Sequence, residues 1–257
     1  MSASCPRILS IAGSDSGGGA GIQADIKTIT MLGGHAMTAI TAITAQNTLG
    51  VQSVHLVPTA MVLAQIESVA SDIGVDAVKI GMIGSAEAAR AVADYLDGLS
   101  VPIVFDPVMV ATSGSELADG ETIAAFDRLM DVASVVTPNL PELAALGGRE
   151  EILGHGCHLV IKGGHGEGPV IVDELYSPGG LIRRLEGKRL ETSETHGTGC
   201  TFASALAVGL GSGMDLTAAF EQATSFTRIA ILEAPGLGAG SGPLGHQFVT
   251  DFQDEDR

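Results

Sequence analysis

Short apolar runs alternate with longer segments of helical spacing along this chain, and this alternation constrains the fold more than any other feature. The first unit is an apolar run at 7–12, a glycine-rich stretch at 13–21 and a helical pattern at 22–29. A strand, a glycine-rich turn and a helix in this order are typical of α/β proteins that bind a ligand at the strand end. The loop lacks the Gly-Lys-Ser/Thr ending of a Walker phosphate loop, and a flexible turn remains the alternative interpretation.

The same patterns continue to the end of the chain. Strands are predicted at 7–12, 35–46, 51–57, 77–80, 102–105, 134–137, 158–161, 169–175 and 181–190. Helices are predicted at 22–29, 58–72, 85–96, 118–130, 143–146, 150–153, from the loop at 195–200 to about 210, and at 216–232. A chain of 257 residues with this pattern suits one large α/β domain, with a core from about 7 to 246 and a frayed tail at 251–257.

The stretch Thr195-His196-Gly197-Thr198-Gly199-Cys200 leads directly into an alanine-rich helical segment. Glycine lets a ligand approach the backbone, and the first amides of a helix have no internal partner, so such a place binds phosphate or a developing anion. Cys200 lies in the first turn, where a thiol is expected to be acidified. An ordinary glycine-rich helix start is the alternative.

Polar residues stand where several predicted strands end. Gln46 offers a carboxamide that can read a heterocycle edge, although such amides commonly cap turns. Asp106, Asn139 and Glu142 offer oxygen ligands that suit Mg²⁺, with a turn aspartate and a helix-start glutamate as alternatives. Lys162 can neutralise a nucleotide phosphate or be an exposed turn lysine.

Composition excludes several classes of partner. The net charge of −17, with only four lysines, disfavours binding to nucleic acid and to anionic membranes. Three cysteines without a CxxC motif favour a reducing cytosol. The chain opens without a signal-peptide pattern and has no apolar run of bilayer length, so a cytoplasmic protein is expected.

Several of these stretches, taken in order, resemble one family from about residue 7 to 246. They are Ala12-Gly13-Ser14-Asp15, Gly18-Gly19-Ala20-Gly21-Ile22-Gln23-Ala24-Asp25, Thr44-Ala45-Gln46-Asn47-Thr48, Val78-Lys79-Ile80-Gly81-Met82, Asp106-Pro107-Val108-Met109-Val110-Ala111, Thr137-Pro138-Asn139-Leu140-Pro141-Glu142, Lys162-Gly163-Gly164-His165 and His196-Gly197-Thr198-Gly199-Cys200. The chain resembles the hydroxymethylpyrimidine/phosphomethylpyrimidine kinases of thiamine biosynthesis, in the ribokinase superfamily.

The resemblance implies a three-layer α/β/α fold with a largely parallel central sheet, usually assembled as a homodimer. It implies ATP- and Mg²⁺-dependent phosphorylation of 4-amino-5-hydroxymethyl-2-methylpyrimidine and then of its monophosphate. It assigns the pyrimidine site to Gln46, Asp25, Gly13, Met82, Val108 and Ala20. It assigns Mg²⁺ to Asp106, Asn139 and Glu142, and the nucleotide phosphates to Lys162, Gly197 and Gly199. It assigns the anion hole to Gly197, Thr198, Gly199 and Cys200.

The sequence departs from the family pattern twice. The first loop has Ser16-Gly17 where the family has proline and serine after the aspartate, and the segment between Glu142 and Lys162 is shorter than in most relatives. A trimmed periphery with intact chemistry is expected. Cys200 is interpreted as a proton acceptor or as part of the anion hole, with a slight preference for the first. A pyridoxal kinase and a non-catalytic pyrimidine-binding protein are the alternative functions.

Overall fold

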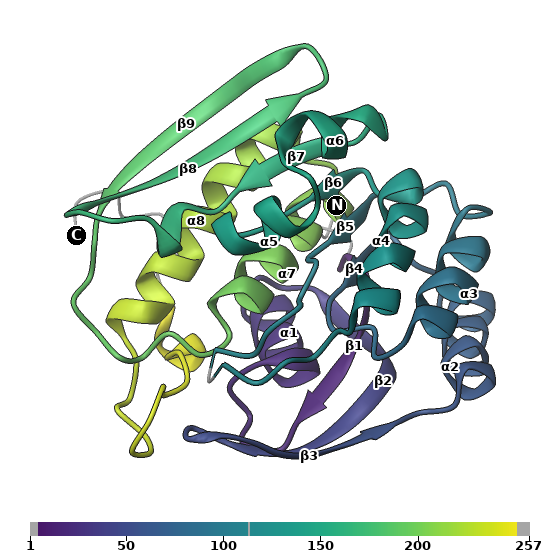
Figure 1. Cartoon of the computed structure of the whole chain (residues 1–257), viewed down its shortest axis with the longest axis horizontal. Helices are drawn as coiled ribbons and strands as arrows, with labels where there is room; N and C mark the ends of the chain where they lie inside the picture. Colours follow the sequence, from purple (N-terminus) through teal and green to yellow (C-terminus); the bar gives the residue numbers. More distant parts are fainter. Residues whose placement is uncertain (1–4, 113, 251–257) are drawn as a thin grey trace.

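The computed structural model describes residues 5–112 and 114–250 (Figure 1). The strands are β1 (Arg7–Asp15), β2 (His35–Asn47), β3 (Gly50–Leu56), β4 (Ala77–Ile80), β5 (Ile103–Phe105), β6 (Val135–Val136), β7 (His158–Ile161), β8 (Val170–Ser177) and β9 (Gly180–Lys188). The α-helices are α1 (Gly21–Met31), α2 (Thr59–Asp72), α3 (Ala86–Leu96), α4 (Gly120–Val132), α5 (Leu140–Ala145), α6 (Arg149–Gly154), α7 (Thr198–Gly211) and α8 (Leu216–Leu232). Two 3₁₀ turns lie at Gly163–His165 and His246–Phe248.

The nine strands form one continuous sheet in the order β3-β2-β1-β4-β5-β6-β7-β8-β9. The pairings from β2 to β7 are parallel, and β3, β8 and β9 add antiparallel edges. Because the inner strands run in the same direction, their carboxyl ends meet along one edge of the sheet. The largely parallel sheet predicted from the sequence is therefore confirmed.

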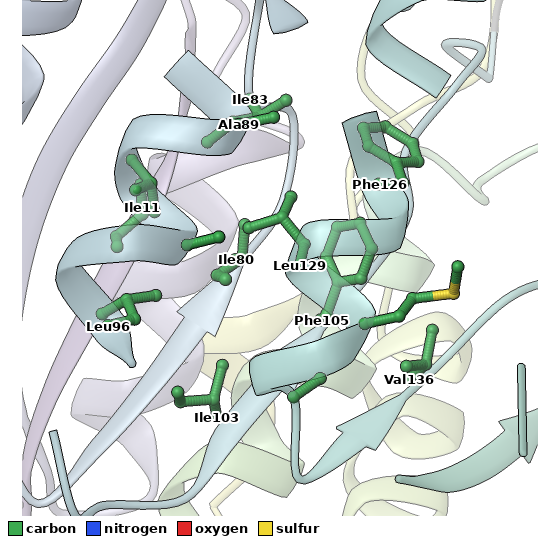
Figure 2. Close-up of a cluster of buried hydrophobic side chains, with 14 of the residues drawn as sticks. Ile11, Ile80, Ile83, Ala89, Leu96, Ile103, Phe105, Phe126, Leu129 and Val136 are labelled. Atoms are coloured by element: carbon green, nitrogen blue, oxygen red, sulfur yellow. The ribbon is translucent and has the colours of Figure 1, made fainter. Parts of the chain in front are cut away.

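Helices cover both faces of this sheet (Figure 1), with α2, α3 and α4 on one face and α1, α7 and α8 on the other. In β5 the side chains of Ile103 and Phe105 enter the first core, whereas Val104 enters the second. Figure 2 shows the first core, which contains Phe105 and Phe126. Their rings pack edge to face, with ring centroids 5.2 Å apart. Strands that are apolar on both faces, as here, are typical of buried parallel sheets.

Local chemistry explains most helix starts. The side chains of Ser85, Asp119 and Asp215 accept backbone N–H groups at the starts of α3, α4 and α8. Pro58 precedes the first residue of α2, where its missing N–H costs nothing.

The structure differs from the predicted elements mainly at their ends. β1 continues through Gly13 to Asp15, with a register shift between Ala12 and Ser14 against β2. Between Glu142 and Lys162 the chain forms two six-residue helices, α5 and α6, in place of a longer insertion. The predicted frayed tail at 251–257 lies outside the described residues. In the described part of the chain, the helices are too short or too polar to cross a bilayer.

Candidate active site

A buried ion pair lies at the carboxyl end of the central strands. Asp106 follows β5 and Lys162 follows β7, and Lys162 Nζ donates to Asp106 Oδ1 at 2.6 Å. The Asp106 carboxylate, with 2% of its side chain exposed, also accepts the hydroxyl of Thr137 at 3.2 Å. Burial by itself lowers the pKa of Lys162, but the neighbouring carboxylates outweigh it and raise that pKa. Lys162 is therefore a fixed positive charge at neutral pH, and its expected role on nucleotide phosphates stays a prediction.

Glu142 faces this pair from the start of α5. Its Oε2 accepts the backbone N–H of Asn139 at 2.8 Å, and Asn139 Oδ1 accepts the backbone N–H of Glu142 at 2.9 Å. This reciprocal pair is a capping box, so the helix-start interpretation of Glu142 is correct. The two residues nonetheless lie beside Lys162, because Asn139 forms a parallel bridge with it. The Asn139 oxygen expected to bind Mg²⁺ is thus already used by the helix.

The environment of Glu142 changes its ionisation. Burial raises the pKa of Glu142 to about 7; Lys162 lowers this pKa, and the Asp106 carboxylate raises it. The charge on Glu142 therefore depends on pH in the neutral range, unlike that of an exposed glutamate.

We expect Glu142→Gln to raise the melting temperature at about pH 8 by a few degrees and to leave it unchanged below about pH 4. The folded protein keeps the Glu142 proton up to about pH 7, whereas an unfolded glutamate releases it near 4.5. Wild-type stability therefore falls as the pH rises between these values, and glutamine removes this loss while keeping the capping oxygen.

Thermal unfolding at both pH values measures this effect. Glu150→Gln is the matched control, because Glu150 is an exposed acid in the first turn of α6. Equal shifts for the two variants at about pH 8 would contradict the burial argument.

The first turn of α7 closes the site. Gly197 caps this helix with φ of 89°, and a Cβ there would collide with the carbonyl oxygen of Gly19. A Cβ at Gly199 would stand 3.2 Å from Lys162 Nζ and 3.3 Å from Asp106 Oδ2. Glycine at both positions therefore brings the backbone of the helix start against the Asp106–Lys162 pair, although the Thr198 N–H already donates to the carbonyl of Thr195 at 3.3 Å. The anion site expected at residues 197–199 stays a prediction, and this arrangement is compatible with it.

Cys200 lies in this first turn, half-buried, but its predicted acidification is wrong. Burial raises the pKa of the Cys200 thiol to about 11. The ammonium of Lys79 lowers this pKa, but the carboxylates of Asp25 and Asp106 raise it. The cost of removing a thiolate from water exceeds the gain at the helix start, so the thiol is neutral at pH 7.

The role expected of Asp25 also needs correction. Its carboxylate is completely buried and binds Lys79 Nζ through both oxygens at 2.9 Å. The hydroxyls of Ser10 and Ser204 donate to the same carboxylate at 2.5 and 2.8 Å. Because these four hydrogen bonds occupy a fully buried carboxylate, Asp25 offers no exposed oxygen to a pyrimidine ring. Lys79 was missed by sequence reasoning; its only signal was a lysine inside an apolar strand.

The remaining predicted pyrimidine residues lie near the ends of β1, β2 and β4. A Cβ at Gly13 would stand 3.0 Å from the sulfur of Met82, so these two residues are neighbours. Gln46 is half-buried at the end of β2, and Ala20 is the residue before α1. Val108 is half-buried two residues after Asp106, and its backbone N–H donates to the carbonyl of Asp106 at 2.8 Å.

Asp15 and His196 are functional candidates that the sequence did not single out as site residues. Asp15 accepts backbone N–H groups of Gly17, Gly19 and Ala20 at 2.8–2.9 Å and so shapes the glycine-rich loop. His196 Nε2 lies 2.9 Å from Asp15 Oδ2. The pair therefore joins the loop after β1 to the loop before α7, which are 181 residues apart.

The carboxylates present fit Mg²⁺ in part. Mg²⁺ is commonly bound by one or two carboxylates together with water and substrate phosphates. Asp106 Oδ2 faces the first turn of α7, and Glu142 is close enough for its pKa to respond to Asp106. Within the described residues, no group of three His, Cys, Asp or Glu side chains forms a closed metal site. The donor set suits an ion that takes its other ligands from phosphate and water.

Comparison with known proteins agrees with this geometry. The family model described as phosphomethylpyrimidine kinase matches residues 15–245. A hydroxymethylpyrimidine/phosphomethylpyrimidine kinase of Rhizobium meliloti is 46% identical over 93% of this chain and 96% of its own length. A thiamine biosynthesis multifunctional protein of Corynebacterium efficiens is 42% identical over 95% of this chain, which spans only 36% of that longer protein.

Solved structures share the fold. An ADP complex of Bacillus subtilis pyridoxal kinase has a TM-score of 0.87 at 34% identity, covering 95% of this chain and 98% of that one. A phosphomethylpyrimidine kinase from Clostridium difficile 630 has a TM-score of 0.76 at 36% identity, covering 88% of this chain and 99% of that one. The predicted three-layer ribokinase-like fold is confirmed by these neighbours.

Proposed function

The chain belongs to the phosphomethylpyrimidine kinase family, and from this premise we propose the reaction and the roles of its residues. The protein is a phosphotransferase that uses ATP to phosphorylate 4-amino-5-hydroxymethyl-2-methylpyrimidine and then its monophosphate. The observation that carries this proposal is the Asp106–Lys162 pair packed directly against the glycine-rich start of α7. It supplies a fixed cation, a carboxylate and the backbone of a glycine-rich helix start at one point.

Phosphoryl transfer passes through a loose transition state, so positioning and charge neutralisation supply most of the catalysis. Lys162 would bind the nucleotide phosphates, while the amides of residues 197–199 hold the charge that develops on the transferred group. Asp106 keeps Lys162 oriented through the 2.6 Å contact. When bound, Mg²⁺ would neutralise phosphate charge; Asp106 and Glu142 are the residues that would hold it.

A product assay with the hydroxymethylpyrimidine, ATP and Mg²⁺ tests this function. Separation of monophosphate from diphosphate shows whether one or both steps occur. Neither product from a folded protein would overturn the proposal. Omission of Mg²⁺ from the same assay tests the metal requirement.

Pyridoxal kinase activity is the second candidate, because the structural neighbour with the TM-score of 0.87 is a pyridoxal kinase. Kinases named for either substrate share this fold, so the fold alone does not distinguish them. The 46% identical relative is named for the pyrimidine. We expect kcat/KM to be higher for the pyrimidine than for pyridoxal. The reverse order would favour the second candidate.

A non-catalytic pyrimidine-binding protein would keep the ring site without needing the phosphate groups. The Asp106–Lys162 pair argues against it, since a buried carboxylate beside a half-buried ammonium is costly and ring binding alone does not need this pair. ATP consumption that depends on the pyrimidine alcohol excludes this alternative, and tight ring binding without turnover would support it.

We expect Cys200→Ala to lower kcat by more than about tenfold while pyrimidine binding persists. The neutral thiol favours a role in the anion hole over a role as a base. Turnover and calorimetric binding of the pyrimidine measure the two effects separately. Near-normal turnover would remove Cys200 from the chemistry.

The remaining expectations concern organisation. We propose a single kinase domain, supported by the continuous nine-stranded sheet. We also propose a homodimer and a cytoplasmic location. Apolar side chains exposed on the β2–β3 ribbon support the dimer: Ile43, Leu49, Val54 and Leu56. Sedimentation equilibrium measures the mass of the assembly, and a monomer at micromolar concentration would contradict the homodimer.

The cytoplasmic location is supported by the cysteines, which remain unpaired. Fractionation of cells tests this location.

A further inference from the structure

His196 lies where four segments meet, and the mechanism above does not use it. Its ring is buried, with Nε2 2.9 Å from Asp15 Oδ2 and 3.2 Å from the Gln46 side-chain nitrogen. Nδ1 lies 3.4 Å from the hydroxyl of Thr112. Gly19 packs against the ring so closely that a Cβ there would collide with it. These contacts leave the imidazole one orientation.

The hydrogen bond with Asp15 decides which ring nitrogen of His196 carries the proton. Burial raises the pKa of Asp15, but hydrogen bonds from His196 and from backbone amides outweigh it and keep that pKa below the usual value. An ionised carboxylate only accepts hydrogen bonds. His196 Nε2 must therefore donate to Asp15, and the Thr112 hydroxyl beside Nδ1 can pair with that nitrogen as donor or as acceptor.

A protonated Nε2 then constrains the Gln46 amide. One end of this amide meets His196 Nε2 at 3.2 Å, and the other meets Thr44 Oγ1 at 3.1 Å. A nitrogen facing His196 would set two donors against each other. Thr44 Oγ1 lies 3.0 Å from the carbonyl of Ser14, to which it can donate while accepting from an amide N–H. With the amide oxygen facing His196 and the nitrogen facing Thr44, no two donors oppose each other, and the amide oxygen shares the single Nε2–H with Asp15 Oδ2.

We propose that His196, oriented by Asp15, is a positioning residue that fixes this orientation of the Gln46 amide and thereby selects the ring edge of the substrate. The inference rests on the proposed function, in which Gln46 contacts the ring. A 4-aminopyrimidine edge places an amine donor beside a ring-nitrogen acceptor, whereas a 4-oxo ring places an acceptor beside an N–H donor. A Gln46 amide held in one orientation presents its oxygen and its N–H in fixed positions. It can therefore pair with the donor–acceptor pattern of only one of these two ring edges.

The first test reads the tautomer directly. In a long-range ¹H–¹⁵N spectrum of the full-length wild-type protein, we expect the His196 ring to carry its proton on Nε2. His196→Gln identifies the signal by its loss. A ring whose Nε2 carries no proton would overturn the proposal. This measurement needs no substrate, so it stands even if the protein does not phosphorylate the pyrimidine.

The second test measures specificity. We expect His196→Ala to lower the ratio of kcat/KM for the aminopyrimidine alcohol to that for its 4-oxo analogue by about tenfold, the worth of one hydrogen bond. His196→Gln, whose side-chain N–H can reach the Nε2 position, is expected to restore most of this ratio. Thr112→Val is the matched control, because it removes only the longer contact on Nδ1 and should leave the ratio unchanged.

A merely structural role for His196 gives a different result. His196→Ala would then lower kcat/KM equally for both rings and leave their ratio unchanged, which would overturn the proposal. Circular dichroism and thermal unfolding show whether each variant folds. Should His196→Ala not fold, His196→Met takes its place, because it fills the site without an N–H donor, and a ratio equal to that of the wild type would overturn the proposal. A wild type inactive on the aminopyrimidine alcohol contradicts the proposed function instead.

Discussion

Replacing Lys162 by methionine is expected to lower kcat by about 10²–10³-fold, the loss found when a group that stabilises transition-state charge is removed. Among the described residues, Lys162 is the only lysine whose Nζ hydrogen-bonds Asp106, at 2.6 Å from Oδ1. The raised pKa of Lys162 keeps its side chain charged. Methionine keeps the apolar length of the side chain without the charge. Steady-state kinetics with ATP and the pyrimidine alcohol measure the loss, and a fall of less than about threefold would contradict the role.

Two controls separate catalysis from folding in this experiment. Lys188→Met makes the same change at an exposed position at the end of β9 and should leave kcat unchanged. Lys162→Met also leaves the buried Asp106 without its cation, which is destabilising. Adding Asp106→Asn should recover stability without recovering turnover. Recovery of turnover together with stability would show that Lys162 acts only through folding.

Replacing Lys79 by methionine is expected to lower the free energy of unfolding by about 3–5 kcal/mol, the cost of leaving a buried charge without its partner. Lys79 and Asp25 both have fully buried side chains, and each Asp25 oxygen lies 2.9 Å from Lys79 Nζ. Burial by itself lowers the pKa of Lys79, but Asp25 outweighs it and the pKa is raised. Without Lys79, the Asp25 carboxylate keeps only the Ser10 and Ser204 hydroxyls.

Urea unfolding measures this loss, with Lys188→Met again as the exposed control. The double variant Lys79→Met, Asp25→Asn should recover a large part of the stability, because asparagine is neutral and still reaches the two serines. A loss below about 1 kcal/mol for Lys79→Met would contradict the assignment of a buried ion pair. An unchanged loss in the double variant would place the effect in packing and not in charge.

The existence and type of the secondary elements were predicted well from local pattern. β4 at Ala77–Ile80 and β7 at His158–Ile161 have the predicted bounds, because short apolar runs between turn residues leave little choice. Element ends were predicted less well. β1 continues to Asp15 because the bulged pairing with β2 carries the strand through Gly13. That pairing depends on a distant segment and has no signal in the loop itself.

The candidate site was predicted in part. Asp106, Lys162 and Gly199 were expected together and are together, since strand ends and a helix start converge at one edge of a parallel sheet. The environment of Cys200 was predicted incorrectly, because a rule for helix starts takes no account of burial. Asp25 was expected at the ring, but it is bound to a lysine 54 residues away.

By itself, the sequence determined the alternation of strands and helices, the placement of polar groups at strand ends, and the family. These features depend on residues close together in the chain, where periodicity, glycine and proline act directly. Only the tertiary structure decided that Lys79 neutralises Asp25, that the Cys200 thiol keeps its proton, and that His196 contacts both Asp15 and Gln46. Each of these depends on desolvation and on contacts between distant segments, and such energies exist only once the chain has packed.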